Sequence, residues 1–397
     1  MNKWIRRVSG AAIAASLTLA GAASAQTPAA PAPERDLYKV NPFLDSGAGI
    51  APRGPRGGGQ AGAPAPITPE AVAVANAEMA KPRTEPGYVM PRLAIGQPDL
   101  QGVWSNASNT RMARPAQFKS LVMTDEEAAK ARAANPSNIR QATDDNQKHE
   151  DGLLNGKDLA SGRGYNAFWI DPGNNYALVK GTWRTSWITD PPNGQQPPQT
   201  AEGRAILAAR REGVTRGNGY DNPEERSNWE RCVSFSGGGP PLGNGLYNNN
   251  FRITQSPDHI VIEAEMIHEA RIVRLNAEHG PKELNLWHGD SIGWWEGDTL
   301  VVETINVGRG SGTQLTSSGK IIERFTRYNE KQVLYEFEVN DPVLYGQVWK
   351  GEMGLNASPG LFEYACHEGN YGLHGILEGG RNNDRKGIVN VAGSREE

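Results

Sequence analysis

Apolar and polar residues alternate with a period of two along the second half of the chain. From residue 251 to residue 353, short apolar runs are separated by turn residues such as Pro, Asp, Gly and Asn. Within one run, Ile260, Ile262 and Ala264 share a face, which is the pattern of a half-buried strand. Eight strands are expected, over residues 251–255, 259–265, 268–275, 291–296, 299–304, 320–327, 332–339 and 347–353.

A series of strands joined by short turns is typical of an antiparallel meander. The fold class that this pattern predicts is mainly β, with a few short helices. The expected architecture is an incomplete barrel similar to that of a lipocalin, and a β-sandwich is the alternative. Strands and helices do not alternate along the chain as a doubly wound parallel sheet requires, so that fold is not expected.

Capping signals predict the helices. Thr68 is followed by a proline, the arrangement of an N-cap and a first helical residue. Thr124 and Glu127 have the spacing of a capping box at the start of a second helix. The helices are expected over residues 68–80, 124–134 and 200–212.

The N-terminus has the pattern of a signal peptide. Basic residues precede an Ala-rich apolar run over residues 8–23, and Ala23-Ser24-Ala25 is a small-residue cleavage site. The run is too short and too rich in Ala for a transmembrane anchor, and no cysteine near the cut offers a lipid anchor. We therefore expect residues 1–25 to be removed and the protein to be periplasmic or secreted, without a stable membrane anchor.

Composition divides the rest of the chain. The chain has 47 Gly and 27 Pro, and thirteen of the prolines lie between residues 28 and 98. Such a segment buries little surface, so residues 26–97 are expected to form a disordered tail that contributes little to stability. Residues 98–381 are expected to form a single β-rich domain that includes a polar loop at 136–161, and residues 382–397 a polar tail.

Charge and motif spacing restrict the partners. The net charge is −4 and becomes more negative once the leader is removed, which disfavours a nucleic-acid partner. No Gly-rich strand–turn–helix segment indicates a nucleotide cofactor, and the seven histidines lack the spacing of a metal site. We expect a small-molecule substrate or ligand, no cofactor and no metal.

Cys232 and Cys366 are the two cysteines of the chain, and they are 134 residues apart. An oxidising compartment favours a disulfide between them, although two free buried thiols or a single nucleophilic cysteine are alternatives. A cross-link of this span stabilises a fold by about 4–5 kcal/mol in the chain-entropy model.

The candidate catalytic residues are His367, Glu368, His268 and Asp290. His367 follows Cys366 and can act as acid or base near neutral pH, with Glu368 orienting it or acting alone. The alternative for this segment is a structural corner. On a continuous strand His268 would face inward as a core or site residue, whereas a bend near Met266 would break that phase. Asp290 is either a site carboxylate or the start of an Asx turn.

Four further residues are candidates for substrate binding. An arginine on a strand can bind a carboxylate or a hydroxyl-rich ligand. Tryptophan and tyrosine rings can stack on a sugar or an aromatic ring, although most large aromatics simply fill a β core. The candidates are Arg271, Trp287, Trp295 and Tyr371.

Five sequence strings stand out: ERC at 230–232, GDSIG at 289–293, WEGDTLVVET at 295–304, ERFTR at 323–327 and YACHEGNY at 364–371. In combination they resemble a widespread family of exported, functionally uncharacterised bacterial proteins. The resemblance covers residues 98–381 and implies the domain limits and the exported location, but it implies no mechanism. Similar sequences often carry another residue at position 288, so His288 is not counted among the candidates.

Two functions fit these observations best, and an envelope scaffold without a pocket is a third possibility. The first is a secreted enzyme of the lyase, isomerase or hydrolase class that acts on a small molecule by acid–base chemistry. The alternative is a non-catalytic periplasmic protein that binds a small apolar or aromatic ligand in a barrel cavity. An enzyme requires two titratable groups within reach of one another, whereas a binding protein requires only a cavity with few polar anchors.

Overall fold

The computed structural model describes residues 66–145, 171–214, 220, 222–235, 237–281, 283–284, 286–308 and 315–388. The expected signal peptide and the first part of the expected tail lie outside the described residues, as do the end of the C-terminal tail and most of the expected polar loop. None of the helices in the described part is long and apolar enough to cross a membrane.

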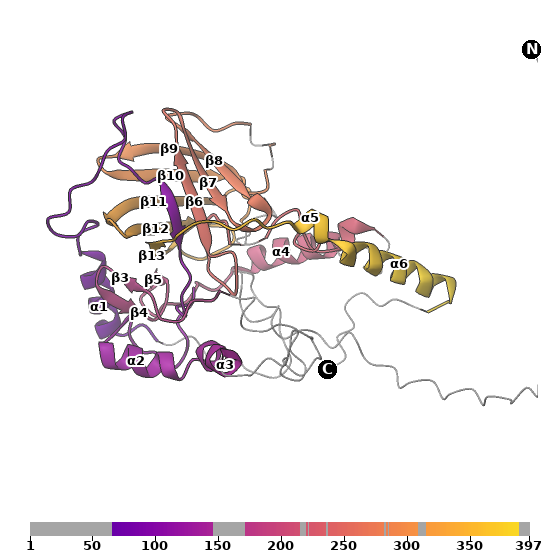
Figure 1. The fold of residues 1–397 in the computed structure, drawn as a ribbon, viewed down its shortest axis with the longest axis horizontal. Helices are drawn as coiled ribbons and strands as arrows, with labels where there is room; N and C mark the ends of the chain where they lie inside the picture. Colours follow the sequence, from indigo (N-terminus) through magenta and orange to yellow (C-terminus); the bar gives the residue numbers. More distant parts are fainter. Residues whose placement is uncertain are drawn as a thin grey trace, which may run out of the picture. The chain divides into compact units, whose positions relative to one another are not determined.

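A closed barrel of nine strands forms the centre of the fold (Figure 1). The strands follow one another around it in the order β1, β6–β13, and β13 pairs with β1 to close it. The β8–β9 pair is parallel and the other pairs are antiparallel. The strands are β1 (Gly102–Ser105), β6 (Asn250–Gln255), β7 (His259–Ala264), β8 (Ala270–Leu275), β9 (Asp290–Glu296), β10 (Thr299–Ile305), β11 (Lys320–Asn329), β12 (Gln332–Asn340) and β13 (Trp349–Ala357).

The mainly β, barrel-like fold predicted from the sequence is confirmed, and so are its eight strands. The barrel is closed rather than incomplete because β1 adds a ninth strand, in which Trp104 pairs with both Phe251 and Ala357. The series is also not a pure meander. The chain between Leu275 and Asp290 crosses over so that β9 runs in the same direction as β8, which a tight hairpin turn cannot achieve.

Alternating residues of β12 belong to the main hydrophobic core. Tyr335 and Phe337 are buried there, with the Phe325 ring 4.9 Å from Tyr335 and the Trp349 ring 5.6 Å from Phe337 between centroids. Leu242 also belongs to this core, and its backbone N–H donates to the Tyr335 hydroxyl at 2.9 Å. The Gly-Gly-Pro-Pro segment before Leu242 is thereby anchored to the barrel.

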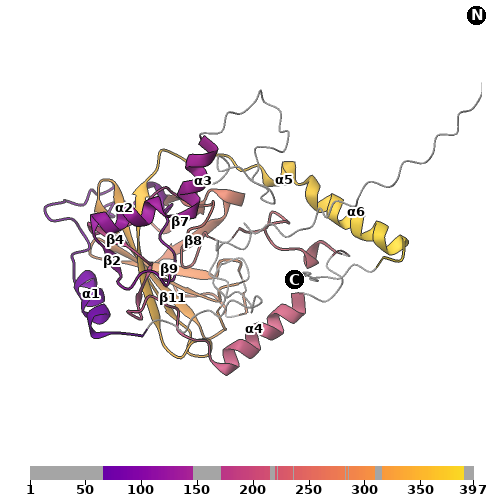
Figure 2. The same ribbon diagram turned by 90° about the horizontal axis from the view of Figure 1, so that it is seen from below.

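A small sheet made of β2 (Val122–Met123), β4 (Thr182–Arg184) and β3 (Leu178–Val179) lies beside helix α2 (Asp125–Ala133), as Figure 2 shows. Ala128 of α2 packs on Met123 and Tyr176. The capping box between Thr124 and Glu127 is present as predicted. A short strand, β5 (Ile188–Asp190), pairs with β13.

Helix α4 (Ala201–Val214) lies where a helix was expected. Helix α3 (Pro136–Asp145) occupies the start of the segment expected to be a loop, so that expectation is wrong for these residues. The polar composition that suggested a loop is that of a helix with little buried surface. Two single-turn helices, η2 (Pro223–Glu225) and η3 (Met266–His268), complete this part of the chain.

Helix α1 (Pro69–Met79) has Thr68 as its N-cap, as predicted, with the Thr68 side chain accepting from the Ala71 N–H. The residues around it were assigned to the tail, yet they bond to the rest of the fold. Glu78 is buried and accepts from Arg184 at 2.7 Å. Ion pairs also join Arg83 to Glu336 and Arg92 to Asp298. The packed part of the chain therefore begins upstream of residue 97.

The last two helices of the described residues are α5 (Cys366–Gly369) and α6 (Tyr371–Arg385). Neither helix is among those that the capping signals predict, and α6 extends into the expected C-terminal tail. Asn370 caps α6 by accepting from the Leu373 N–H. A Cβ atom at Gly380 would lie 2.5 Å from the Tyr220 Cβ, so this glycine permits a close contact rather than a break in the helix.

Candidate active site

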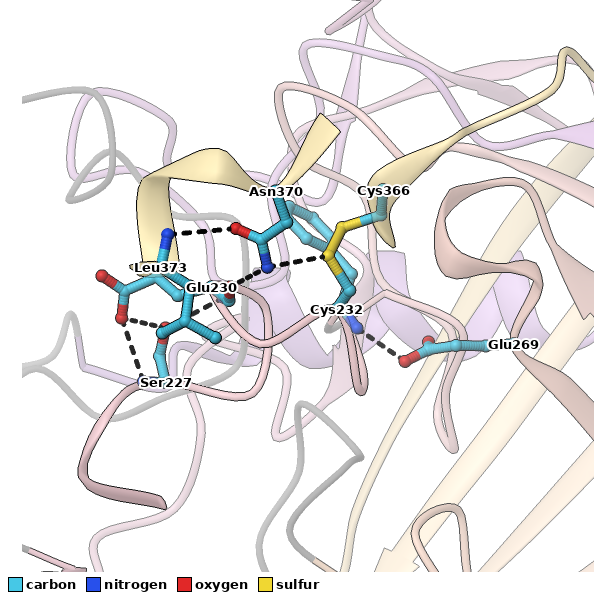
Figure 3. The surroundings of a disulfide bond; sticks show 8 residues. Ser227, Glu230, Cys232, Glu269, Cys366, Asn370 and Leu373 are labelled. Atoms are coloured by element: carbon cyan, nitrogen blue, oxygen red, sulfur yellow. Dashed lines mark hydrogen bonds between the residues drawn. A yellow bond between two sulfur atoms is a disulfide. The ribbon is translucent and has the colours of Figure 1, made fainter. Parts of the chain in front are cut away.

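Cys232 and Cys366 form a disulfide, with their Cα atoms 5.8 Å apart (Figure 3). The predicted pairing is confirmed, and the alternatives of free thiols and a nucleophilic cysteine are excluded. Beside the disulfide, the Asn370 side chain donates to the Glu230 carbonyl at 2.8 Å. The disulfide and this bond join α5 to the loop that contains Cys232.

Cys232→Ser is expected to lower the free energy of unfolding by about 4–5 kcal/mol, because the disulfide closes a segment of 134 residues. Urea unfolding of the oxidised proteins measures this. The double variant Cys232→Ser/Cys366→Ser should lose as much as the single variant, since either change removes the same cross-link. A single variant as stable as the parent would contradict a structural role for the disulfide.

His367 and Glu368 lie exposed on α5, and Tyr371 is 82% exposed at the start of α6. Among the described residues, no hydrogen bond or ion pair joins either His367 or Glu368 to another side chain. This geometry agrees with the structural-corner interpretation of the segment. The structure does not bring these three residues together with the other predicted site residues.

A turn at η3 decides which residue of the 265–269 string faces inward. Ile267 and His268 have φ values of 62° and 53°, so the strand is interrupted and its alternation shifts by one residue. Beyond the turn, the buried positions fall to Glu269, Arg271 and Val273, and His268 is exposed. The inward position that a continuous strand predicted for His268 is therefore taken by Glu269.

The two oxygens of the Glu269 carboxyl group differ in their hydrogen bonding. Its Oε1 accepts from the Phe235 N–H at 2.6 Å, and Phe235 lies three residues after Cys232. Its Oε2 is buried and has no hydrogen-bond partner among the described residues, and the side chain is 4% exposed. Burial raises the pKa of Glu269 to about 7, and the bonds from Ser234 and Phe235 oppose this only in part. The carboxyl group is thus partly protonated at neutral pH.

His288 lies opposite the free oxygen of Glu269. Its Nδ1 lies 3.0 Å from the Gly239 carbonyl, which can only accept, so this geometry assigns the proton of the neutral ring to Nδ1. The Nε2 atom then presents a lone pair and lies 3.7 Å from Glu269 Oε2. Burial lowers the pKa of His288, and the charge of Arg271 lowers it further against the opposing effect of Gly239.

Arg271, two residues after Glu269 on the chain, forms a buried ion pair with Glu323. Arg271 donates from Nη1 and Nη2 to the two oxygens of Glu323, and the Tyr335 hydroxyl donates to the same carboxylate at 2.7 Å. The Tyr335 hydroxyl also accepts from Leu242, three residues after Gly239. Arg271, predicted to bind substrate, is therefore occupied by Glu323 and acts on His288 through its charge.

Asp290, predicted as a catalytic carboxylate, has both oxygens occupied. Arg274 donates to Oδ1 at 2.6 Å, and the Gly280 N–H donates to Oδ2 at 2.7 Å. His279 Nδ1 lies 3.1 Å from Oδ2. Burial alone would raise the pKa of Asp290, but these three groups together lower it. This arrangement holds the start of β9 and leaves the carboxylate ionised.

The two predicted tryptophans lie in different surroundings. Trp287 is exposed and directly precedes His288 along the chain. Trp295 is partly buried and packs against the main core. Of the two tryptophans, Trp287 is the one that neighbours His288 in the sequence.

No family model, curated protein or solved structure matches this chain. The candidate site therefore rests on geometry. Sequence reasoning missed Glu269 because it followed the alternation through the turn at η3, although a bend near Met266 was considered. His288 was set aside, and the sequence held no signal that the Gly239 carbonyl, 49 residues away, would orient its ring.

Proposed function

We propose that the protein is an exported enzyme that moves a proton to and from a small-molecule substrate, with Glu269 and His288 as its acid–base pair. The observation that carries the proposal is the buried Glu269 Oε2, which has no hydrogen-bond partner among the described residues and lies 3.7 Å from His288 Nε2. Buried carboxyl oxygens are nearly always hydrogen-bonded, and exceptions with a shifted pKa concentrate at functional sites. The exported location rests on the leader sequence.

The two groups have complementary roles at neutral pH. The protonated Glu269 carboxyl group donates from Oε2, while the neutral His288 ring accepts at Nε2. A substrate placed beside the pair would receive the Glu269 proton at one atom and lose a proton from a neighbouring atom to His288 Nε2, so that the pair exchanges one proton for another. This is the chemistry of an isomerase or a lyase, and a pKa near the working pH lets Glu269 act in both directions.

Separate anchors hold the pair in place. The Phe235 amide fixes Glu269 Oε1, and the Gly239 carbonyl fixes His288 Nδ1. Phe235 follows the disulfide, and Gly239 belongs to the segment anchored on Tyr335 through Leu242. Positioning of this kind preserves the geometry on which proton transfer depends.

Deuterium exchange tests the proposal without a known substrate. The mature protein is incubated in D₂O with a panel of 2-oxo acids, 2-hydroxy acids and reducing sugars, and label at carbon is measured by mass spectrometry. Exchange into at least one compound is expected. Glu269→Gln and His288→Gln should each reduce its rate by about 10²-fold or more, the usual contribution of a positioned acid or base.

The exposed His374 on α6 supplies a matched control, because His374→Gln removes a histidine far along the chain from the pair and should leave exchange unchanged. Exchange that persists in both site variants would overturn the proposal. Exchange lost in His367→Ala instead would place the chemistry at α5. Compounds that bind without any exchange would favour the non-catalytic binding protein.

A further inference from the structure

Arg114 is a buried guanidinium whose charge is not paired by any carboxylate among the described residues. The residue is 6% exposed, and Nη1 donates to the Pro192 carbonyl at 3.0 Å. Its Nε and Nη2 atoms are buried and have no hydrogen-bond partner in the described part of the chain. Buried charges in proteins are normally paired, because an unpaired charge in a low-dielectric interior is costly.

Other buried arginines of this chain follow that rule. Arg184 pairs with Glu78 and Glu352, and Arg271 pairs with Glu323. Burial lowers the pKa of Arg114 to about 10, and no neighbouring acid opposes that effect. Arg114 therefore differs from these two in having no carboxylate partner among the described residues.

The free edge of Arg114 has the geometry that binds an oxyanion. The Nε–H and Nη2–H bonds lie along one edge of the planar guanidinium group and are nearly parallel. They can therefore donate to two oxygens of one carboxylate or phosphate. The chain contains an example of this mode, because Arg83 uses its Nε and Nη2 to bind the two oxygens of Glu336.

The loop after β5 is built around Arg114. The Arg114 N–H donates to the Gly194 carbonyl at 2.8 Å, and the Gln195 side chain donates to the Arg114 carbonyl at 2.7 Å. Gly194 has a φ of 71°, and a Cβ atom there would lie 2.8 Å from the Arg114 Cβ and 3.0 Å from its Nε. A side chain at position 194 would therefore press on the guanidinium.

The same segment carries two more buried polar atoms without partners among the described residues. They are the Gln196 amide nitrogen, directly after Gln195, and the Thr189 hydroxyl, which belongs to β5 just before the loop. Both can donate a hydrogen bond to an anion. Arg114 and two residues of the 189–196 segment to which it bonds thus carry buried donors without partners among the described residues.

We propose that Arg114 is the centre of a binding site for the carboxylate or phosphate group of a small molecule. Nε and Nη2 hold the anion side-on, and Gln196 and Thr189 supply further donors. The site is assigned independently of the Glu269–His288 pair, so either assignment can fail without the other.

Thermal unfolding of the full chain with succinate or inorganic phosphate, at an ionic strength kept constant with NaCl, tests the proposal. At an anion concentration ten times its Kd, the Tm is expected to rise by about 3–6 °C. Arg114→Met should abolish the rise. Arg252→Met should keep it, because Arg252 is an exposed arginine paired with Glu263 and serves as the matched control. The more effective anion identifies the group that the site prefers.

In the absence of added anion, Arg114→Met should melt at the same temperature as the parent or higher, since it removes an unpaired buried charge. A parent protein that neither anion stabilises beyond NaCl would overturn the proposal, and so would a rise of equal size in Arg114→Met. If Arg114→Met does not fold, Gln196→Leu decides by isothermal titration with the same anions. A Kd raised at least about threefold supports the site, and an unchanged Kd contradicts it.

Discussion

Glu269→Gln is expected to stabilise the protein at pH 8 by about 3–3.5 kcal/mol while it removes the proposed proton transfer. The pKa of this carboxyl group is raised from 4.5 to about 7 by burial. Each unit corresponds to about 1.4 kcal/mol of preference for the neutral form. Gln resembles the protonated carboxyl group in shape and carries no charge, so it escapes the cost of ionising a buried group.

The sign of the pH dependence follows from proton binding. Between pH 4.5 and about 7 the folded protein keeps a proton on Glu269 that the unfolded chain releases. The contribution of Glu269 to stability is therefore complete below pH 4.5 and is lost as the pH rises to about 7. The difference between variant and parent should be smallest near pH 4.5, grow towards pH 7 and stay constant above it, as measured by urea unfolding at several pH values.

Glu303→Gln is the matched control, because its environment has the opposite effect. Burial alone would raise the pKa of Glu303, but Lys320 and His279 together lower it. Its carboxylate therefore stabilises the folded state above pH 4.5, so Glu303→Gln should destabilise the protein at pH 8 and differ less from the parent in acid. A Glu269→Gln variant that follows this pattern instead would contradict a raised pKa.

The sequence predicted those parts of the fold that depend on local patterns. Strands β6 to β13 were found because each alternates over its own length. The closing strand β1 was not recognised as a strand, because its four residues show no comparable pattern and its partners lie about 150–250 positions further along the chain. Helix α6 was missed because its glycines lower helix propensity, while the contact of Gly380 with Tyr220 is a tertiary feature.

The site was less predictable than the fold for a related reason. Ile267 adopts a left-handed conformation that is unusual for a β-branched residue, so no local preference indicates the turn that brings Glu269 inward. His288 gains its role from the Gly239 carbonyl and from the charge of Arg271, both supplied by distant parts of the chain. Alternation and motif strings carry no information about such pairings.

The segment around α1 is expected to contribute much of the stability, although the sequence assigned it to a tail. Glu78 is one of two carboxylates in a buried network, in which Arg184 bonds to Glu78 and Glu352, and Lys180 lies 3.0 Å from Glu352. Without Glu78, two buried cations would share one carboxylate. Breaking a buried pair in this way costs about 3–5 kcal/mol.

A chain that starts at residue 98 should therefore melt at least about 6 °C below one that starts at residue 66, at about 2–4 °C per kcal/mol for a domain of this size. Differential scanning calorimetry measures the two temperatures. Glu78→Gln in the longer chain isolates the charge and should reproduce much of the loss, whereas Glu70→Gln, on an exposed position of the same helix, should change little. Equal melting temperatures for the two chains would show that Arg184 and Lys180 need only Glu352, and that residues 66–97 add little to the stability of the barrel.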